Sequence, residues 1–508
     1  MPRETKAHEG SRERRNAVAN YAGKFWSGAS NFLFVPLYID AVGIEGYGII
    51  AFQAVLLVLM YVIDGGLSTI FARFVATAKT PAEIAPMLAS LERAYSSVML
   101  GIVVVATIAV FAFGLADGLP ADTLSPVSNA SGLSLMILGA ALQICMSVYS
   151  GLFFGSGRHV LANAFQVCFT ATRSGLVLIP LYATGSLLVY FLWQMAATLV
   201  FLGLMRHVAW RTLGARFKLR RSQFVDSLWQ IWPAASSVLM ITAASALNQQ
   251  LDRLVVTAVA GVAGLGTYSV AVLIGGLPVA VASPYAATIA PRLHRDAVAV
   301  ASSAAAALFV RDSVRVAAIA GALTVLILAA PSHWYQMVNP QVDGTSRWGL
   351  VVSLLAAGNF ALALQLVPYQ LCIARLNLRA NTITAVIAVA LTGPLSYWAA
   401  TLFGEKGVAA TWLVTNTAML AFMGWRVFVL LGTNTFRLWL ERGALAPCIC
   451  MGGAVALSLA LPCVWGDWVA AEVDAAIGAA IYVAGMHWVL RRCAHPEPAQ
   501  PNPRPAPE

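Results

Sequence analysis

Charge is scarce in this sequence. Asp, Glu, Lys and Arg make up only 11% of its 508 residues, whereas soluble domains carry about a quarter. Acidic residues are fewer than basic ones, 22 against 32, and the formal net charge is +10. In a soluble protein this balance would suggest a nucleic-acid partner, but 59% of the residues are hydrophobic. The composition therefore indicates a membrane protein with basic cytoplasmic loops and no nucleic-acid partner.

Cysteines are few as well. The seven are odd in number and nearly all fall in apolar segments, which argues against a disulfide framework. Cys448 and Cys450, two positions apart on an expected helix, diverge by about 200° and form a poor metal pair. We expect no metal and no cofactor, and we leave coupling to an ion or to the membrane potential open.

Long polar segments are absent, and apolar runs of about 18 to 25 residues recur along the whole chain. The first run is too long for a signal-peptide core and no small-residue cleavage site follows it, so it predicts an uncleaved helix. The sequence predicts an all-α polytopic membrane protein with about fourteen transmembrane helices. These helices are expected near 18–39, 47–65, 94–115, 133–154, 162–183, 187–205, 228–250, 266–289, 314–330, 349–371, 382–403, 408–428, 445–464 and 470–490.

Basic residues divide unevenly between the two sides of the membrane. With a cytoplasmic amino terminus, 27 of the 32 Lys and Arg fall in cytoplasmic segments, and only Arg347 and Lys406 fall on the other side. The positive-inside rule then predicts that both termini are cytoplasmic. The expected organisation is a cytoplasmic tail 1–17, an N-lobe 18–205, a basic linker 206–227, a C-lobe 228–428, helices 13 and 14 within 429–490, and a disordered Pro-rich tail 491–508.

A glycine pattern repeats at an offset of 218 residues. The turn 43–48 between helices 1 and 2 has glycine at its first, fourth and sixth positions, and so does 261–266 between helices 7 and 8. The same offset places Ser27 on Ser245. We therefore expect a parallel repeat of two six-helix lobes, with helices 13 and 14 as an addition. Two such bundles are typical of transporters that bind substrate near the midplane, between the repeats.

Polar side chains form stripes on three of the expected helices. One stripe alone is typical of helix packing, whereas three favour a hydrated central cavity. The stripes are Asn20, Lys24, Ser27 and Asn31 on helix 1, Asn163, Gln166, Thr170 and Arg173 on helix 5, and Thr242, Ser245, Gln249 and Asp252 on helix 7, where Arg253 follows.

Two basic residues inside the spans are the main candidates for substrate contact. Lys24 is about 9 Å inside the membrane, where it either lines the cavity, pairs with Asp64 at similar depth, or snorkels to the interface. Asp64 is accordingly a candidate for a structural ion pair or for coupling. Arg173 lies near the middle of helix 5, where snorkelling is harder and no acid is expected at its depth. We expect Arg173 to line the cavity, and the alternative is a bond to helix-end carbonyls or to an unforeseen acid.

Helix 8 contains the segment IGGLP, with Gly275, Gly276 and Pro278. Glycine and proline free backbone groups and allow bending. The segment predicts either a hinge or a static kink.

The opening of the chain has several features in a fixed order. A polar first helix leads to a Gly-x-x-x-Tyr-Gly turn, and a second helix ends in Asp-x-Gly-Leu followed by an Arg. The residues concerned are Gly43, Tyr47, Gly48, Asp64, Gly66, Leu67 and Arg73, with a second-half counterpart in QQLDRLVV, which contains Asp252 and Arg253, and in GLGTYSVA. This pattern resembles the polysaccharide-flippase (Wzx-like) family, in the superfamily of drug/cation antiporters and lipid II flippases.

The resemblance implies two six-helix lobes that work by alternating access. It also implies transfer of an undecaprenyl-diphosphate-linked oligosaccharide from the inner to the outer leaflet of a bacterial inner membrane, for a surface glycan such as lipopolysaccharide or exopolysaccharide. Membrane lipids, a polysaccharide polymerase and glycosyltransferases are the partners implied. The sugar is not identified.

Two other functions compete with this interpretation. A drug/cation antiporter needs acidic groups in its cavity, whereas the charges inside these spans are mainly basic. A membrane-embedded glycosyltransferase or acyltransferase needs carboxylates or histidine at one membrane face. Glu472 and Asp474 are the one outer acidic pair of that kind, with no histidine near them in the sequence. The sequence therefore predicts a transporter and not an enzyme.

Overall fold

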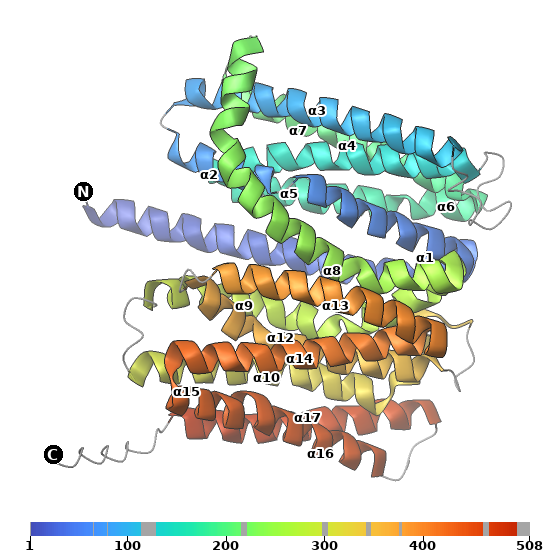
Figure 1. The fold of residues 1–508 in the computed structure, drawn as a ribbon, viewed down its shortest axis with the longest axis vertical. Coiled ribbons are helices and arrows are strands. Elements are labelled where there is room, and N and C mark those ends of the chain that lie inside the picture. The colour runs from blue at the N-terminus through green and yellow to red at the C-terminus, as the bar shows by residue number, and fades with distance from the viewer. Residues whose placement is uncertain are drawn as a thin grey trace. The chain divides into compact units, whose positions relative to one another are not determined.

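The computed structural model of the protein is helical throughout its described residues (Figure 1). The backbone is described for 2–64, 66–78, 80–112, 129–214, 221–296, 303–341, 347–374, 378–460 and 467–494. Side chains are described over the same ranges except 2–25, 27, 29, 31, 63, 129, 221–242, 244–245, 290–296, 303–305, 374, 378–388, 467–471 and 494. No strand occurs in these ranges, which confirms the predicted all-α class.

The helices follow one another with short connections. They are α1 (Pro2–Asp64), α2 (Leu67–Thr77), α3 (Pro81–Ala112), α4 (Asn129–Gly155), α5 (His159–Thr170), α6 (Leu178–Thr184), α7 (Leu187–Leu213), α8 (Arg221–Gly275), α9 (Leu277–Asp296), α10 (Ser303–Ala329), α11 (Pro331–Val338), α12 (Trp348–Ala374), α13 (Leu378–Phe403), α14 (Glu405–Leu431), α15 (Thr433–Leu438), α16 (Ala446–Ala460) and α17 (Asp467–Ala494), with π-helical segments η1 (Ala171–Leu176) and η2 (Trp439–Leu445).

The helices extend past the apolar runs that predict them. For example, α3 begins at Pro81, well before the expected start at 94. Hydropathy marks only the part of a helix within the hydrocarbon, whereas backbone hydrogen bonding continues into the polar interface. Eleven helices in the described part of the chain are long and apolar enough to cross a membrane. One of them, Phe32–Val62, bends at Gly43 and contains parts of two predicted spans, so the number fourteen stays a prediction.

The chain forms two compact units. One comprises Met1–Val270 and Val389–Glu405, and the other comprises Ala271–Ala388 and Lys406–Glu508. The division passes through α8 and α13. The lobe limits expected from the sequence are different, and they stay a prediction.

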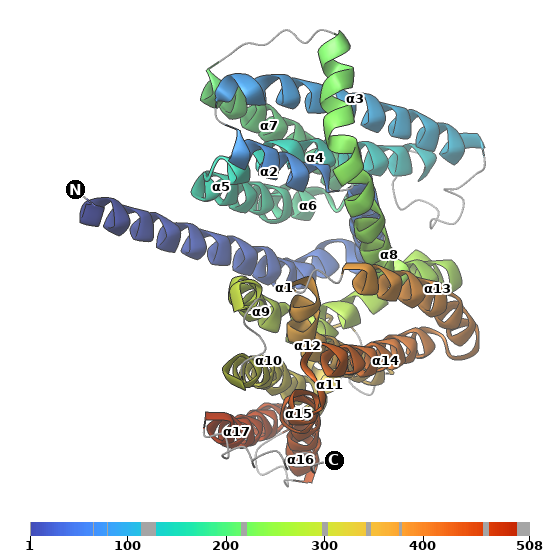
Figure 2. The same cartoon turned by 60° about the vertical axis from the view of Figure 1, so that its left-hand side comes forward.

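In the first unit, α4 packs against α2, α3 and α7, and Figures 1 and 2 show α3, α4 and α7 side by side. Gly151 and Gly155, four residues apart on α4, face the backbone of α2. A Cβ added at Gly151 would lie 2.5 Å from the carbonyl oxygen of Ser68, and one at Gly155 would meet that of Ala72. Small residues at this spacing allow two membrane helices to approach closely.

In the second unit, α10 packs against α9, α12, α16 and α17. Tyr482 of α17 is fully buried, and its hydroxyl donates to the carbonyl oxygen of Ala317 on α10 (2.8 Å). Gly321, one turn further along α10, leaves the space that the Tyr482 ring occupies. The two helices predicted as an addition to the repeat are thus anchored on α10.

The repeated glycine turns have the same backbone conformation. Gly43 interrupts α1 with φ 73° and ψ 173°, and Gly261 interrupts α8 with φ 70° and ψ −172°. Residues other than glycine rarely adopt such a positive φ. The sequence-based equivalence of the two turns is therefore confirmed in the structure.

The two turns also contact each other reciprocally within the first unit. A Cβ at Gly48 would collide with the carbonyl oxygen of Val262, and a Cβ at Gly266 would collide with that of Ile44. Ile44 and Val262 are themselves related by the offset of 218. Each copy of the turn therefore presents a glycine to a carbonyl of the other copy, as a two-fold relation requires.

We expect Gly48→Ala to lower the free energy of unfolding by about 1–3 kcal/mol, because the new methyl group meets backbone and not a flexible side chain. Thermal unfolding of the purified protein in detergent micelles measures this loss. Gly101→Ala is the matched control, since a Cβ at Gly101 meets nothing within 4 Å. Equal stability of the two variants would contradict the close contact.

Candidate functional site

The helix that carries Arg173 changes its hydrogen-bonding pattern there. α5 passes into the π-helical segment η1, and α6 continues the helix. A π-helical turn disturbs the usual pairing of carbonyl groups, and such turns are frequent at functional sites. Three successive carbonyls here accept bonds from other helices: Tyr38 Oη donates to Ser174 O (2.6 Å), Trp193 Nε1 to Thr172 O (2.9 Å) and Gln194 Nε2 to Arg173 O (3.0 Å). Side chains of α1 and α7 thus hold the π-helical segment in place.

The Arg173 side chain is half-buried and has neutral partners. Its Nη1 donates to Gln143 Oε1 on α4 (2.9 Å), and its guanidinium lies 5.7 Å from the centroid of the Phe169 ring. Among the described residues, no carboxylate forms an ion pair with it. An arginine keeps its charge in proteins, and its five donors exceed what one amide oxygen accepts. The guanidinium therefore retains capacity for an anionic partner.

Three tyrosines interact electrostatically with this guanidinium. Tyr38, Tyr61 and Tyr190 all lie within electrostatic range of Arg173. The rings of Tyr38 and Tyr190 contact each other edge to face, with centroids 5.8 Å apart. The described hydrogen-bonding groups around Arg173 are uncharged, which suits the binding of a hydroxyl-rich ligand with one anionic group.

Asp64 forms a second polar centre, at the end of α1. It is 6% exposed and accepts hydrogen bonds from Ser68 on α2 (2.9 Å), Ser147 on α4 (2.7 Å) and Tyr95 on α3. One carboxylate thus joins four helices. The side chain of Lys24, its predicted partner, lies outside the described residues, so the ion pair stays a prediction.

A third polar group lies on α8. Asp252 is buried, and it accepts bonds from the Arg253 amide (2.8 Å) and the Tyr268 hydroxyl (3.3 Å). Arg253 Nη1 donates to Gln250 Oε1 (3.0 Å), while its Nε is buried without a hydrogen-bond partner. The sequence singled out Asp252 and Arg253 but missed Gln250.

The predicted stripes are only partly covered by the described side chains. Asn163 is buried and donates to the carbonyl of His159 in its own helix (2.8 Å), Thr170 is half-buried, and Gln166 and Gln249 are exposed. The π-helical segment begins at Ala171 and contains Arg173, so Arg173 does not continue the α-helical spacing of the stripe. The candidates whose side chains lie outside the described residues are Asn20, Lys24, Ser27, Asn31, Thr242 and Ser245.

The predicted hinge segment coincides with a break between helices. α8 ends at Gly275 and α9 begins at Leu277, with Pro278 in its first turn, where the missing N–H has no helical partner to lose. A Cβ at Gly275 would lie 2.5 Å from that of Leu355, so α12 packs directly against this end of α8. Movement at the break stays a prediction.

The structure brings a histidine to Glu472 that the sequence places far from it. His333 Nε2 of α11 lies 3.6 Å from Glu472 Oε1 of α17. The two are far apart in the chain, and only packing brings them together. Within the part of the chain that the structure describes, no group of three His, Cys, Asp or Glu side chains is arranged to hold a metal ion.

The sequence analysis missed several groups that complete the candidate site. Gln143 and Gln194 are each the one side-chain amide in their expected spans. A polar side chain inside the membrane marks a polar contact, so both could have been identified from the sequence. The hydroxyls around Asp64 gave no comparable signal, because serine and tyrosine are common in such helices.

The fold is similar to that of two solved transporters. The chain matches the lipid II flippase MurJ in an inward closed conformation with a TM-score of 0.65 and 12% identity, over 94% of this chain and 99% of that chain. It matches the MATE multidrug transporter DinF-BH with a TM-score of 0.55 and 15% identity, over 83% and 97% of the respective chains. These likenesses show the fold, which the chain shares with a flippase and with a multidrug transporter, and the eleven apolar helices of the described residues agree with a multi-pass membrane protein.

The family follows from the sequence itself. Residues 14–295, more than half of the chain, match the family model described as polysaccharide biosynthesis protein. The chain belongs to this family, and the predicted resemblance is confirmed. No curated protein matches the chain in sequence.

Proposed function

We propose that this protein carries an undecaprenyl-diphosphate-linked oligosaccharide from the inner to the outer leaflet of a bacterial inner membrane, for assembly of a surface polysaccharide. The observation that carries the proposal is Arg173, a guanidinium on a π-helical segment whose described partners are neutral. Membership of the polysaccharide biosynthesis protein family supports the same substrate class.

The chemistry of the substrate fits the surroundings of Arg173. A guanidinium binds a diphosphate through paired, charge-assisted hydrogen bonds. The amides of Gln143 and Gln194 and the hydroxyls of Tyr38 and Tyr190 supply neutral donors and acceptors for sugar hydroxyls. The polyprenyl tail is apolar and stays in the bilayer while the headgroup moves.

The proposal includes an orientation of the protein in the membrane. Both termini are cytoplasmic in this proposal, because the basic residues concentrate in the segments on that side. The two lobes alternate their access, with the break at Gly275–Leu277 as the bending point and Asp64 as the candidate for ion or membrane-potential coupling. A polymerase and glycosyltransferases would act on the substrate before and after transfer.

Deletion of the gene tests the function. We expect loss of one surface glycan, with its lipid-linked oligosaccharide retained on the inner leaflet, because a charged sugar headgroup does not cross the hydrocarbon unaided. Expression from a plasmid restores export and serves as the control. Normal export in a deletion strain without a substitute paralogue would refute the proposal.

A drug/cation antiporter is the second candidate. Asp64 and Asp252 are both buried carboxylates in the first unit, and a cation exchanger needs such groups. The same deletion strain separates the two functions. Unchanged sensitivity to cationic drugs supports the flippase, and a hypersensitive strain with normal glycan supports the antiporter.

A further inference from the structure

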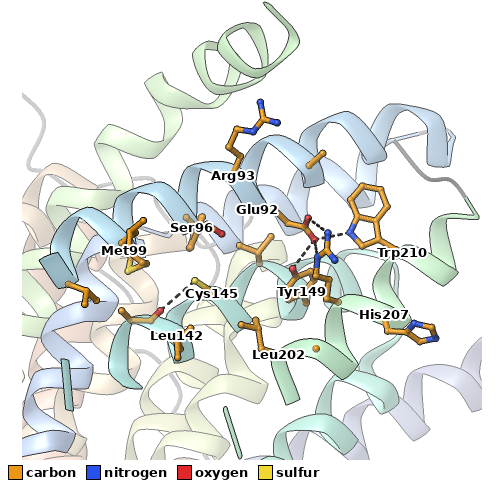
Figure 3. A pocket seen from close by; sticks show the side chains of 18 of the residues that line it. Glu92, Arg93, Ser96, Met99, Leu142, Cys145, Tyr149, Leu202, His207 and Trp210 are labelled. Carbon is orange, nitrogen blue, oxygen red and sulfur yellow. Dashed lines mark hydrogen bonds and ion pairs between the residues drawn. The ribbon is translucent and has the colours of Figure 1, made fainter. Parts of the chain in front are cut away.

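A large groove lies between α3, α4 and α7 in the first unit (Figure 3). Its volume is about 1700 Å³, larger than the few hundred to about 1,000 Å³ of ordinary small-molecule pockets. One half is apolar and is lined by Met99, Leu100, Val103, Leu138, Leu142 and Leu202. The lining of the other half, which we call the polar half, contains Glu92, Tyr95, Ser96, Cys145 and Tyr149. The groove therefore brings polar groups between helices that are otherwise apolar.

The polar half opens at one end of these helices. Glu92 accepts hydrogen bonds from Tyr149 Oη (2.8 Å) and Trp210 Nε1 (2.8 Å), and it forms an ion pair with Arg206 (3.2 Å). Figure 3 shows these groups converging on Glu92. Arg206 and Trp210 lie near the end of α7, just before the basic linker that is expected in the cytoplasm. The mouth of the polar half therefore lies on the expected cytoplasmic side.

Tyr95 separates the polar half from Asp64. It lines the groove, its side chain is only 4% exposed, and its hydroxyl donates a hydrogen bond to Asp64 Oδ1. Tyr95 follows Glu92 by three residues on α3, which places the two on one face of the helix, about 4.5 Å apart along its axis. Cys145 of α4 also lines the groove and interacts electrostatically with both Tyr95 and Tyr149. One phenol thus stands between the polar half and the buried carboxylate.

The other described neighbours of Asp64 suit a proton better than a metal ion. Ser68 of α2 and Ser147 of α4 donate hydrogen bonds to its carboxylate, as the phenol of α3 does. Tyr61, on the same helix as Asp64, interacts electrostatically with both Asp64 and Arg173. A metal ion is bound through oxygen lone pairs, whereas these three hydroxyls direct their hydrogens at the carboxylate. A proton, by contrast, passes along such hydrogen bonds.

We infer that the polar half of the groove is the route by which protons from the cytoplasm reach Asp64, with the Tyr95 hydroxyl as the last donor. A proton from water in the groove adds to the Tyr95 oxygen while the phenolic proton passes to Asp64 Oδ1. The phenol is neutral before and after this transfer, and Asp64 gains one proton. This route rests on the coupling role proposed for Asp64, and it names the proton as the coupling ion. The experiments below use no substrate, so their failure would leave the proposed flippase activity untouched.

Thiol labelling tests whether water reaches the polar half. Cys145 is kept as the single cysteine of the full-length protein, and membrane vesicles of either orientation are treated with a charged, impermeant methanethiosulfonate. We expect labelling from the cytoplasmic face only. Ile108→Cys in a cysteine-free protein is the matched control, because Ile108 is exposed on the same helix as Tyr95 but does not line the groove, and it should stay unlabelled. An unlabelled Cys145, or labelling from the opposite face alone, would overturn the inference.

Time-resolved infrared spectroscopy tests the proton transfer itself. A light flash releases protons from a caged acid around the protein in nanodiscs, and the carboxylic acid band that Asp64→Asn lacks reports protonation of Asp64. The rate at which this band rises should fall at least about tenfold in Tyr95→Phe, which keeps the ring but lacks the donor. Modification of Cys145 should slow it as well. Tyr149→Phe is the matched control, because its hydroxyl bonds Glu92 and not Asp64, and it should keep the wild-type rate.

Three results of the infrared experiment would overturn the inference. The first is the lack of any band that depends on Asp64, which would show that the carboxylate takes up no proton. The second is an equal rate in Tyr95→Phe and wild type, which would exclude the phenol as the last donor. The third is a band that added sodium removes at constant pH, which would show that Asp64 exchanges a metal ion.

Discussion

Arg173→Ala should abolish export of the surface glycan while the protein remains folded and at its normal level in the membrane. A central arginine costs about 2.5–3.5 kcal/mol on insertion scales, so alanine inserts more readily. The π-helical segment should persist, because its carbonyls are bonded by Tyr38, Trp193 and Gln194 and not by the Arg173 side chain. What the variant loses is the cation that we propose to bind the diphosphate.

Arg173→Lys should restore export only in part. An ammonium group keeps the charge but cannot form the paired, planar hydrogen bonds of a guanidinium. Surface glycan is measured in the deletion strain that expresses each variant, with membrane protein quantified in parallel. Arg158→Ala is the matched control, since Arg158 lies at the start of α5, far along the helix from Arg173, and donates an exposed hydrogen bond to Thr212 of α7. Full export by Arg173→Ala at normal expression would exclude a role in substrate binding.

Asp64→Ala should destabilise the protein by about 3 kcal/mol, because three buried hydroxyls lose their acceptor at about 1 kcal/mol each. Asp64→Asn keeps the size of the side chain and one acceptor oxygen, and the hydroxyls can rotate to meet its amide. We expect Asp64→Asn to unfold within about 1 kcal/mol of wild type. Its export should nevertheless fall at least roughly tenfold, since an amide neither exchanges a proton nor balances a neighbouring cation.

Two measurements on the same variants separate the two roles of Asp64. Thermal unfolding in detergent reports its structural role, and glycan export reports its role in coupling. Ser68→Ala removes a single hydroxyl and is the control, with a small loss of stability and normal export expected. An Asp64→Asn protein that exports normally would show that Asp64 only holds helices together. An Asp64→Asn protein that unfolds as readily as Asp64→Ala would lead to the same conclusion.

The sequence predicted the features that depend on local pattern. Apolar runs located the helices, and the glycines of 43–48 and 261–266 located the equivalent turns, because a positive φ restricts the residue type. It did not predict where α3 begins, since the helix continues beyond the apolar run.

The candidate site was predictable only in its charged members. Arg173 stood out as a charge inside an apolar helix, but its partner Gln143 lies on another helix and is identified only by packing. The π-helical segment at Arg173 has no sequence signature that we recognise, because its donors come from α1 and α7. The groove around Glu92 also escaped prediction, since α3, α4 and α7 each contribute only part of it.

The contact between Gly48 and Gly266 has the form of a homodimer interface contained in one chain. In a symmetric dimer, residue i of one copy contacts residue j of the other copy, and residue j of the first copy contacts residue i of the second. Ile44 with Gly266 and Val262 with Gly48 satisfy this relation at an offset of 218 residues. A polypeptide of half the length would present both the glycine and the carbonyl needed to pair with a copy of itself. Once two such halves are joined in one gene, the two copies of the contact can mutate independently. Each glycine must then be kept because the other half of the chain packs against it.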